Sequence, residues 1–318
     1  MTGTVRVGVI GTGFGAQVVA PAFDATAGCD VVEVVTPRDE AAVAALCARP
    51  DIDLVSVHSP PFLHLDHVRH AVAAGHAVLC DKPFGRNADD SAEMVDLARA
   101  AGVIGLLNFE RRFDPAREQL HDLLLAEAIG RPYHFQYSRF IALPEPRRYG
   151  WLSEPALGGG WLGGQGSHLI DAVRWLFGEV AQAAAVMRTP TTHRLDAAGE
   201  LRASTAEDGF TAILRTESGV TAVIDAEIES PVAMPERLVV LGTGGMLAVG
   251  EDRVTRTTAA GDVETIAVEL GGRPSLLVAM QRWASVVCEA VRTGTVAPGS
   301  PTFADGLACA QVMDRMRP

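Results

Sequence analysis

The spacing of apolar and polar positions changes along this chain. In the first third, short apolar runs alternate with stretches of helical composition. The run VRVGVI at residues 5–10 is typical of a buried parallel strand. Further strands are predicted at residues 31–35, 54–58, 76–80 and 103–108, with helices around residues 37–51, 64–74 and 89–101. This alternation predicts a doubly wound α/β domain.

After residues 131–132 the pattern becomes one of consecutive strands. YHFQYSRFIAL alternates between apolar and polar positions, and FTAILRT, VTAVIDAEIE and RLVVLGT follow, separated by short turns such as ESG at residues 217–219. Consecutive strands with short turns are typical of an antiparallel sheet. Closing helices are predicted at residues 276–291 and 303–316.

Length and charge limit the classes of protein to which this chain can belong. A chain of 318 residues is long enough for about two domains. The net charge of −12 argues against a nucleic-acid-binding surface, which is normally basic. We see no apolar run long enough for a membrane helix and no signal peptide, and we expect a soluble cytoplasmic protein. The five cysteines, Cys29, Cys47, Cys80, Cys288 and Cys309, are odd in number and widely spaced, which predicts reduced thiols rather than a disulfide framework or zinc site.

A glycine-rich turn follows the first predicted strand. Its sequence, Gly11-Thr12-Gly13-Phe14-Gly15-Ala16, fits G-x-G-x-x-G/A with alanine in the third place. The first glycine allows a tight turn, the second lets a pyrophosphate approach the backbone, and the third position must be small for helix packing. The next helix offers its N-terminal N–H groups to the phosphates. This context of strand, turn and helix predicts dinucleotide binding.

The second predicted strand ends without the acidic residue that usually binds the ribose of NAD. Thr36, Pro37 and Arg38 stand there instead. Arg38 would suit the 2′-phosphate of NADP, so these residues favour NADP over NAD. The alternative is that Arg38 is a solvated residue at the start of the next helix.

Two further motifs carry candidate catalytic groups. Lys82, in CDKPFG, follows the fourth strand at the sheet edge where open α/β folds bind ligands. A lysine there can donate a hydrogen bond to a substrate oxygen and join a proton relay, unless it is only a surface lysine beside a turn. His168 follows six glycines in GGGWLGGQGSHLID at residues 158–171, and a histidine can exchange a proton near neutral pH. We expect Ser167 to cap a helix here. That helix is expected to bury Leu169, Val173 and Leu176.

Several motifs, in order, resemble the Gfo/Idh/MocA family of NAD(P)-dependent oxidoreductases. They are GTGFGA, SPPFLHLDHVRHAVAAGHAVLCDKPFG, NFERRFDP, GGGWLGGQGSHLIDAVRWLFG, STAEDGFTAILRTESGV and PTFADGLACAQVMD. The resemblance covers nearly the whole chain. It implies that Lys82 matches the lysine of the family's Glu-Lys-Pro motif, here Asp81-Lys82-Pro83. It also implies that His168 matches the histidine of a D-x-x-x-H pair.

The chain departs from the family pattern in two places besides the missing ribose-binding acid. Gly164 stands where the aspartate of the D-x-x-x-H pair is expected. Asp171, three residues after His168, would face the same side of the helix. Only one short helical segment separates the second and third predicted strands, where the resemblance implies a helix, a strand and another helix.

The expected architecture is therefore an α/β protein with an N-terminal Rossmann-type parallel sheet, residues 1–115, and a C-terminal α/β domain with an open, mainly antiparallel sheet, residues 116–318. The last helix is expected to pack back on the first domain. The resemblance implies a homo-oligomer, a dimer or tetramer.

The candidate site residues fall into three groups. The catalytic candidates are Lys82 and His168. The expected cofactor-binding residues are Gly11, Thr12, Gly13, Phe14, Gly15, Ala16, Thr36, Arg38, Ser59, Pro60, His64, Asp81 and Lys82. The expected substrate-binding residues are Lys82, Asn108, Arg111, Trp161 and His168. Arg111 and Arg112 would equally suit salt bridges, and Trp151 and Trp161 would equally suit packing. No metal is expected, because the i, i+3, i+6 spacing of His64, His67 and His70 spreads them around a helix.

The expected function is hydride transfer between NAD or NADP and a carbinol or carbonyl carbon of a sugar, polyol or related small metabolite, with no nucleic-acid or membrane partner. One alternative is a glycosidase-like enzyme that uses tightly held NAD. Cofactor that copurifies with the protein, together with net hydrolysis, would reveal this activity. Another is a catalytically impaired dinucleotide-binding relative, motivated by Gly164 and the shortened ribose region, which would bind coenzyme without turnover.

Overall fold

The computed structural model describes residues 3–317 and separates into two compact units. Unit 1 comprises the chain up to Phe113 together with Leu276–Gln311, and unit 2 comprises Asp114–Ser275 and the chain from Val312 onward. Residues 276–311 were expected in the second domain, with the last helix packing back on the first. In the structure this whole segment belongs to unit 1.

Within the described residues, unit 1 is built on a five-stranded sheet in the order β2-β1-β3-β4-β5, with every neighbouring pair parallel. The strands are β1 Val5–Ile10, β2 Cys29–Val35, β3 Leu54–Val57, β4 Ala77–Cys80 and β5 Gly105–Leu107. All four residues of β3 are buried, as expected for a parallel strand covered on both faces. The predicted Rossmann-type parallel sheet is confirmed.

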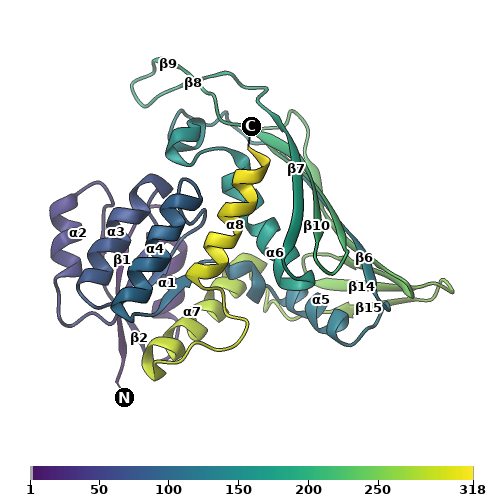
Figure 1. Ribbon diagram of the computed structural model, residues 1–318, viewed down its shortest axis with the longest axis horizontal. Helices are drawn as coiled ribbons and strands as arrows, with labels where there is room; N and C mark the ends of the chain where they lie inside the picture. The colour runs from purple at the N-terminus through teal and green to yellow at the C-terminus, as the bar shows by residue number, and fades with distance from the viewer. Residues whose placement is uncertain (1–2, 318) are drawn as a thin grey trace. The chain divides into compact units, whose positions relative to one another are not determined.

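Helices cover this sheet (Figure 1). The helices of unit 1 are η1 Gly15–Val19, α1 Ala20–Asp24, α2 Glu40–Cys47, α3 Pro61–Ala73, α4 Ala88–Ala101, η2 Glu110–Phe113 and α7 Ser275–Thr293. Helix α8 Phe303–Met316 begins in unit 1 and ends in unit 2. The core joins distant segments: Trp283 and Met280 of α7 are fully buried in one cluster with Val7 and Val9 of β1. Only α2 connects β2 to β3, as predicted, and β2 is an edge strand of this sheet.

Within the described residues, unit 2 contains an eight-stranded sheet in the order β15-β14-β13-β12-β6-β11-β10-β7. Only the β6–β11 pair is parallel, so the sheet is mainly antiparallel as predicted. Its strands are β6 Pro132–Ile141, β7 Val180–Arg188, β10 Gly209–Thr216, β11 Thr221–Ile228, β12 Met234–Gly242, β13 Gly245–Val249, β14 Arg253–Thr258 and β15 Val263–Ala267. A separate hairpin is formed by β8 His193–Leu195 and β9 Leu201–Ala203.

One face of this sheet is packed and the other is open. Along β11, buried and half-buried residues alternate strictly, as the two faces of a strand require. Helices α5 Pro115–Leu125 and α6 Ser167–Phe177 lie on the buried face (Figure 1). Three short helical turns precede α6, namely η3 Trp151–Ser153, η4 Pro155–Leu157 and η5 Leu162–Gly166. Across residues 3–317, no helix is both long and apolar enough to cross a bilayer.

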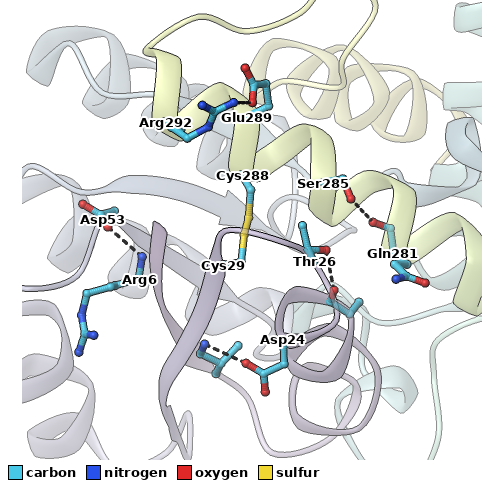
Figure 2. Close-up of a disulfide and its surroundings, with 12 residues drawn as sticks. Arg6, Asp24, Thr26, Cys29, Asp53, Gln281, Ser285, Cys288, Glu289 and Arg292 are labelled. Atoms are coloured by element: carbon cyan, nitrogen blue, oxygen red, sulfur yellow. Dashed lines mark hydrogen bonds and ion pairs between the residues drawn. A yellow bond between two sulfur atoms is a disulfide. The ribbon is translucent and has the colours of Figure 1, made fainter. Parts of the chain in front are cut away.

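The expectation of five reduced cysteines was wrong. Cys29, at the start of β2, forms a disulfide with Cys288 of α7, and their Cα atoms lie 6.6 Å apart (Figure 2). The two residues are separated by 259 positions, so no local spacing could indicate the pair. Cys47, Cys80 and Cys309 are buried and outside this disulfide.

Thiol titration tests this pairing. Protein denatured without reductant should show three reactive thiols, because two of the five cysteines are joined. After reduction the same titration should show five. Five thiols before reduction would contradict the disulfide, and Cys288→Ser should then be indistinguishable from the parent protein in thermal unfolding.

Candidate functional site

The glycine-rich turn of unit 1 lies tightly against the end of β3. Gly11 has φ +147°, and a Cβ there would lie 2.6 Å from the carbonyl oxygen of His58. A Cβ on Gly15 lies 3.0 Å from the Cβ of His58. Gly13 differs, because no atom lies within 4 Å of a Cβ placed there. The first and third glycines of GTGFG therefore serve packing, and the second leaves the backbone open to a phosphate.

A cavity of about 490 Å³ lies between the residues after β2 and helix α3. Its lining includes Pro37, Arg38, Phe62, Leu63, Asp66 and His67. Arg38 is exposed and does not cap α2, since Asp39 does so by accepting a hydrogen bond from Ala42 N–H at 3.0 Å. Asp66 forms an ion pair with Arg69 at 2.7 Å. The cavity stands where a dinucleotide fold receives the adenosine end of its coenzyme.

Ser59 and Pro60 lie between β3 and α3, and His64 lies within α3. Pro60 is the N-cap residue of α3, and the Ser59 hydroxyl bonds with His67 Nδ1 at 2.9 Å. His64 is fully buried, with Nε2 2.7 Å from the Ser59 carbonyl oxygen and Nδ1 3.0 Å from that of Phe84. Burial lowers the pKa of His64 and lowers that of His67 to about 4. Across residues 3–317, no three or more His, Cys, Asp or Glu side chains are grouped to hold a metal ion.

Lys82 lies just beyond Asp81, the first residue after β4, and is the only lysine in the whole sequence. It is half-buried, and its peptide bond to Pro83 is cis. Burial lowers the pKa of Lys82, the charges of Asp81 and Glu110 raise it, and Arg111 lowers it, with a net decrease. A lysine with a lowered pKa at the carboxyl edge of the sheet is suited to exchange a proton near neutral pH.

Asp81 is held on both carboxylate oxygens. Oδ1 accepts from the Lys82 backbone N–H at 2.9 Å and from Asn108 Nδ2 at 3.3 Å. Oδ2 lies 3.3 Å from Nδ1 of His58. Burial raises the pKa of Asp81, but the hydrogen bond and charge of His58, with Lys82, lower it to about 2. Asp81 is therefore an anion at neutral pH.

His58 was not among the site residues predicted from the sequence, although one signal pointed to it. This histidine follows an apolar strand directly, and the carboxyl ends of neighbouring parallel strands lie at one edge of a sheet. A polar residue directly after β3, here His58, is therefore expected to lie close to a polar residue directly after β4, here Asp81.

The polar residues of the segment after β5 have different surroundings from one another. Asn108 is fully buried and bonds to Asp81. Arg112 forms an ion pair with Asp305 at 2.9 Å and donates to the Gly299 carbonyl at 3.0 Å, so it is a structural arginine. Arg111 is half-buried and acts electrostatically on Lys82 and Glu110. Burial raises the pKa of Glu110.

In unit 2 the glycine-rich stretch, residues 158–166, packs against neighbouring residues of the same unit. Gly160 has φ +99°, and a Cβ there would collide with the Glu207 carboxylate. That carboxylate accepts from Leu162 N–H at 3.0 Å, and the Glu207 carbonyl accepts from Trp161 N–H at 2.9 Å. A Cβ on Gly159 would collide with the Trp151 carbonyl oxygen. These glycines therefore allow a fixed loop.

His168 lies in the first turn of α6 and is 4% exposed. Ser167 does not cap this helix as expected: its hydroxyl donates to the Gly163 carbonyl at 2.7 Å. The reason is that η5 already continues into α6, so the N–H groups at Ser167 are not at a helix start. Asp171 of the same helix is 2% exposed.

Gly164, at the position of the missing aspartate, is closely covered. A Cβ there would lie 3.2 Å from Cε3 of Trp161 and 3.6 Å from Cδ2 of Leu152. Trp161 and Trp151 are both half-buried. The Trp161 ring thus packs beside Gly164, and a larger side chain would have to displace it. Lys82 belongs to unit 1 and His168 to unit 2.

Comparison with known proteins identifies related sequences and folds. The family profile described as an oxidoreductase family with an NAD-binding Rossmann fold matches residues 5–109, and the profile of the Gfo/Idh/MocA C-terminal domain matches residues 118–248. An uncharacterized oxidoreductase of Synechocystis sp. is 30% identical over 269 residues, covering 79% of this chain and 72% of its own. Inositol 2-dehydrogenase 3 of Saccharopolyspora erythraea is 27% identical, covering 82% of this chain and 77% of its own. Levoglucosan dehydrogenase in complex with NADH and L-sorbose has the same fold, with a TM-score of 0.87, 21% identity and coverage of 99% and 96% of the two chains.

Proposed function

Because this chain belongs to the Gfo/Idh/MocA family of NAD(P)-dependent oxidoreductases, we propose that it transfers hydride to or from a CH–OH carbon of a sugar or polyol. The observation that carries the proposal is the position of its only lysine, at the carboxyl edge of the sheet that also carries the glycine-rich turn. The relatives support the substrate class, since they include an inositol dehydrogenase and a levoglucosan dehydrogenase.

The residues of unit 1 fit a bound dinucleotide. The open backbone at Gly13 would receive the pyrophosphate, and the cavity beside Arg38 would receive the adenosine end. When bound, the nicotinamide supplies or accepts the hydride. Lys82 would hold the substrate oxygen, accept its proton during oxidation and return it during reduction. Asp81 stays ionised and keeps a negative charge beside Lys82.

Replacing the lysine tests this role. Lys82→Ala should lower turnover by about 10²–10⁴-fold, because a positioned proton donor and acceptor contributes this much. Coenzyme affinity, measured by energy transfer from tryptophan to bound nicotinamide, should stay nearly unchanged. Arg99→Ala is the control, since Arg99 is an exposed helix residue paired only locally with Asp96. Turnover is measured over a panel of sugars and polyols. Equal turnover by Lys82→Ala and the control would refute the catalytic role of Lys82.

We further propose that the coenzyme is NADP. Arg38 is exposed, lines the cavity after β2 and stands where NAD-specific folds carry an acid. Asp66 in the same cavity is paired with Arg69, which reduces its repulsion of a phosphate.

Titration of nucleotide-free protein decides the coenzyme. NADPH should bind more tightly than NADH, and Arg38→Ala should weaken NADPH by about tenfold or more, the worth of one hydrogen bond to a charged group. NADH affinity should change little, and Arg99→Ala should change neither. Tighter binding of NADH by the parent protein would overturn the NADP proposal, and binding without turnover would favour the catalytically impaired relative.

We also propose that unit 2 forms a dimer or tetramer through the open face of its sheet. Ala184, Ile213 and Val223 are paired across β7, β10 and β11, and Ile213 is 56% exposed. Val186, two residues along β7, is 69% exposed. Adjacent exposed apolar side chains on one sheet face are typical of an interaction surface.

Light scattering after size exclusion measures this assembly. The parent protein should have two or four times the 33.6 kDa chain mass, and Ile213→Glu should shift it toward the monomer because a carboxylate would be buried in the interface. Leu125→Glu, at a 71% exposed position on α5, should keep the parent mass. A monomeric parent protein would contradict the proposal.

A further inference from the structure

A buried polar chain runs through the end of β3 to the residue before Lys82. Ser56 Oγ lies 2.7 Å from Nε2 of His58, and His58 Nδ1 lies 3.3 Å from Oδ2 of Asp81. Ser56 and the side chain of His58 are both 0% exposed. Asp81 is then joined to the backbone of Lys82 and to Asn108 through its other oxygen. All these residues belong to unit 1.

The contacts of the chain define which ring nitrogen of His58 faces Asp81. An ionised carboxylate can only accept hydrogen bonds, so Nδ1 of His58 carries a proton toward Asp81. Nε2 of His58 pairs with the hydroxyl of Ser56, which can donate or accept. Asp81 thus has hydrogen bonds to Oδ1 from Lys82 and Asn108, and Nδ1 of His58 lies 3.3 Å from Oδ2, which limits rotation of the carboxylate.

The imidazole is fixed from its other side by the glycine-rich turn. Cβ positions on Gly11 and Gly15 would each lie 3.0 Å from the Cβ of His58, and the ring of Phe14 lies 6.2 Å away. His58 therefore has little freedom to move away from Asp81. The alternative, that it merely fills space under the turn, predicts no dependence on where its hydrogen-bond donor points.

We propose that His58 is a positioning residue that holds the Asp81 carboxylate beside Lys82 and thereby favours the ammonium form of this lysine. Its relevance to catalysis depends on the proposed role of Lys82. The charged or titratable groups that also act on this set include Glu110 and Arg111 of η2, His64 of α3 and Cys80 of β4. Glu110 favours the ammonium and Arg111 opposes it, so Asp81 contributes to a balance that small displacements change.

The single lysine makes a direct measurement possible, without substrate or coenzyme. Competitive acetylation over a range of pH, followed by mass spectrometry of the peptide containing Lys82, reports the titration of the only ε-amine in the chain. The N-terminal amine is separated because it lies in another peptide. The titration of Lys82 requires no substrate and no turnover. Its result therefore tests the role of His58 separately from the proposed function.

Two amide replacements separate positioning from packing. His58→Asn places an N–H donor where Nδ1 stands and should keep the midpoint of Lys82 labelling near that of the parent protein. His58→Gln places its amide toward Ser56 and should lower the midpoint by roughly 0.5–1 pH unit, because Asp81 loses a donor and turns away. Both variants keep a polar side chain of similar size. Circular dichroism and NADPH binding verify their fold.

A double-mutant cycle shows whether the effect passes through Asp81. Asp81→Asn should itself lower the midpoint, and adding His58→Gln should then cause no further decrease. His76→Ala is the matched control, since His76 is a buried histidine before β4 that bonds to the Cys47 carbonyl at 2.7 Å. It should leave the midpoint unchanged. An unchanged midpoint in His58→Gln, or an equal decrease with and without Asp81, would overturn the proposal.

Discussion

The close approach of the turn after β1 to the end of β3 is the constraint on which the candidate site of unit 1 depends. Gly11 and Gly15 bring the backbone against His58, where any Cβ would collide or crowd. The same contact fixes the imidazole that bonds to Asp81. The glycine-rich turn, Asp81 and Lys82 therefore lie at one edge of the sheet, because parallel strands end side by side.

The protonation of Lys82 depends on effects that oppose one another. Burial disfavours an ammonium ion, and the carboxylates of Asp81 and Glu110 favour it. Asp81 can serve this purpose because its hydrogen bonds keep it ionised despite burial. Elsewhere the chain uses arginine for its positive charges. Arginine keeps its proton under all ordinary conditions, so lysine is the cation able to take part in proton transfer.

The glycines before His168 have a physical cause within unit 2. Gly160 leaves room for the Glu207 carboxylate, and Gly159 leaves room for the backbone of the preceding turn. Glu207 in return accepts from the N–H of Leu162 and so holds the loop that enters α6. The loop is ordered by these contacts, which explains how a glycine-rich stretch can hold a buried histidine in place.

Periodicity and short motifs in the sequence determined the parallel sheet of unit 1, the antiparallel sheet of unit 2, the glycine-rich turn and the positions of Lys82 and His168. These features depend on residues close together in the chain, so local spacing contains them. The Cys29–Cys288 disulfide, the Arg112–Asp305 ion pair and the His58–Asp81 contact were decided only by the tertiary structure. Each joins side chains from different strands or helices, and no local pattern specifies which distant residues the packing of a sheet will bring within bonding distance.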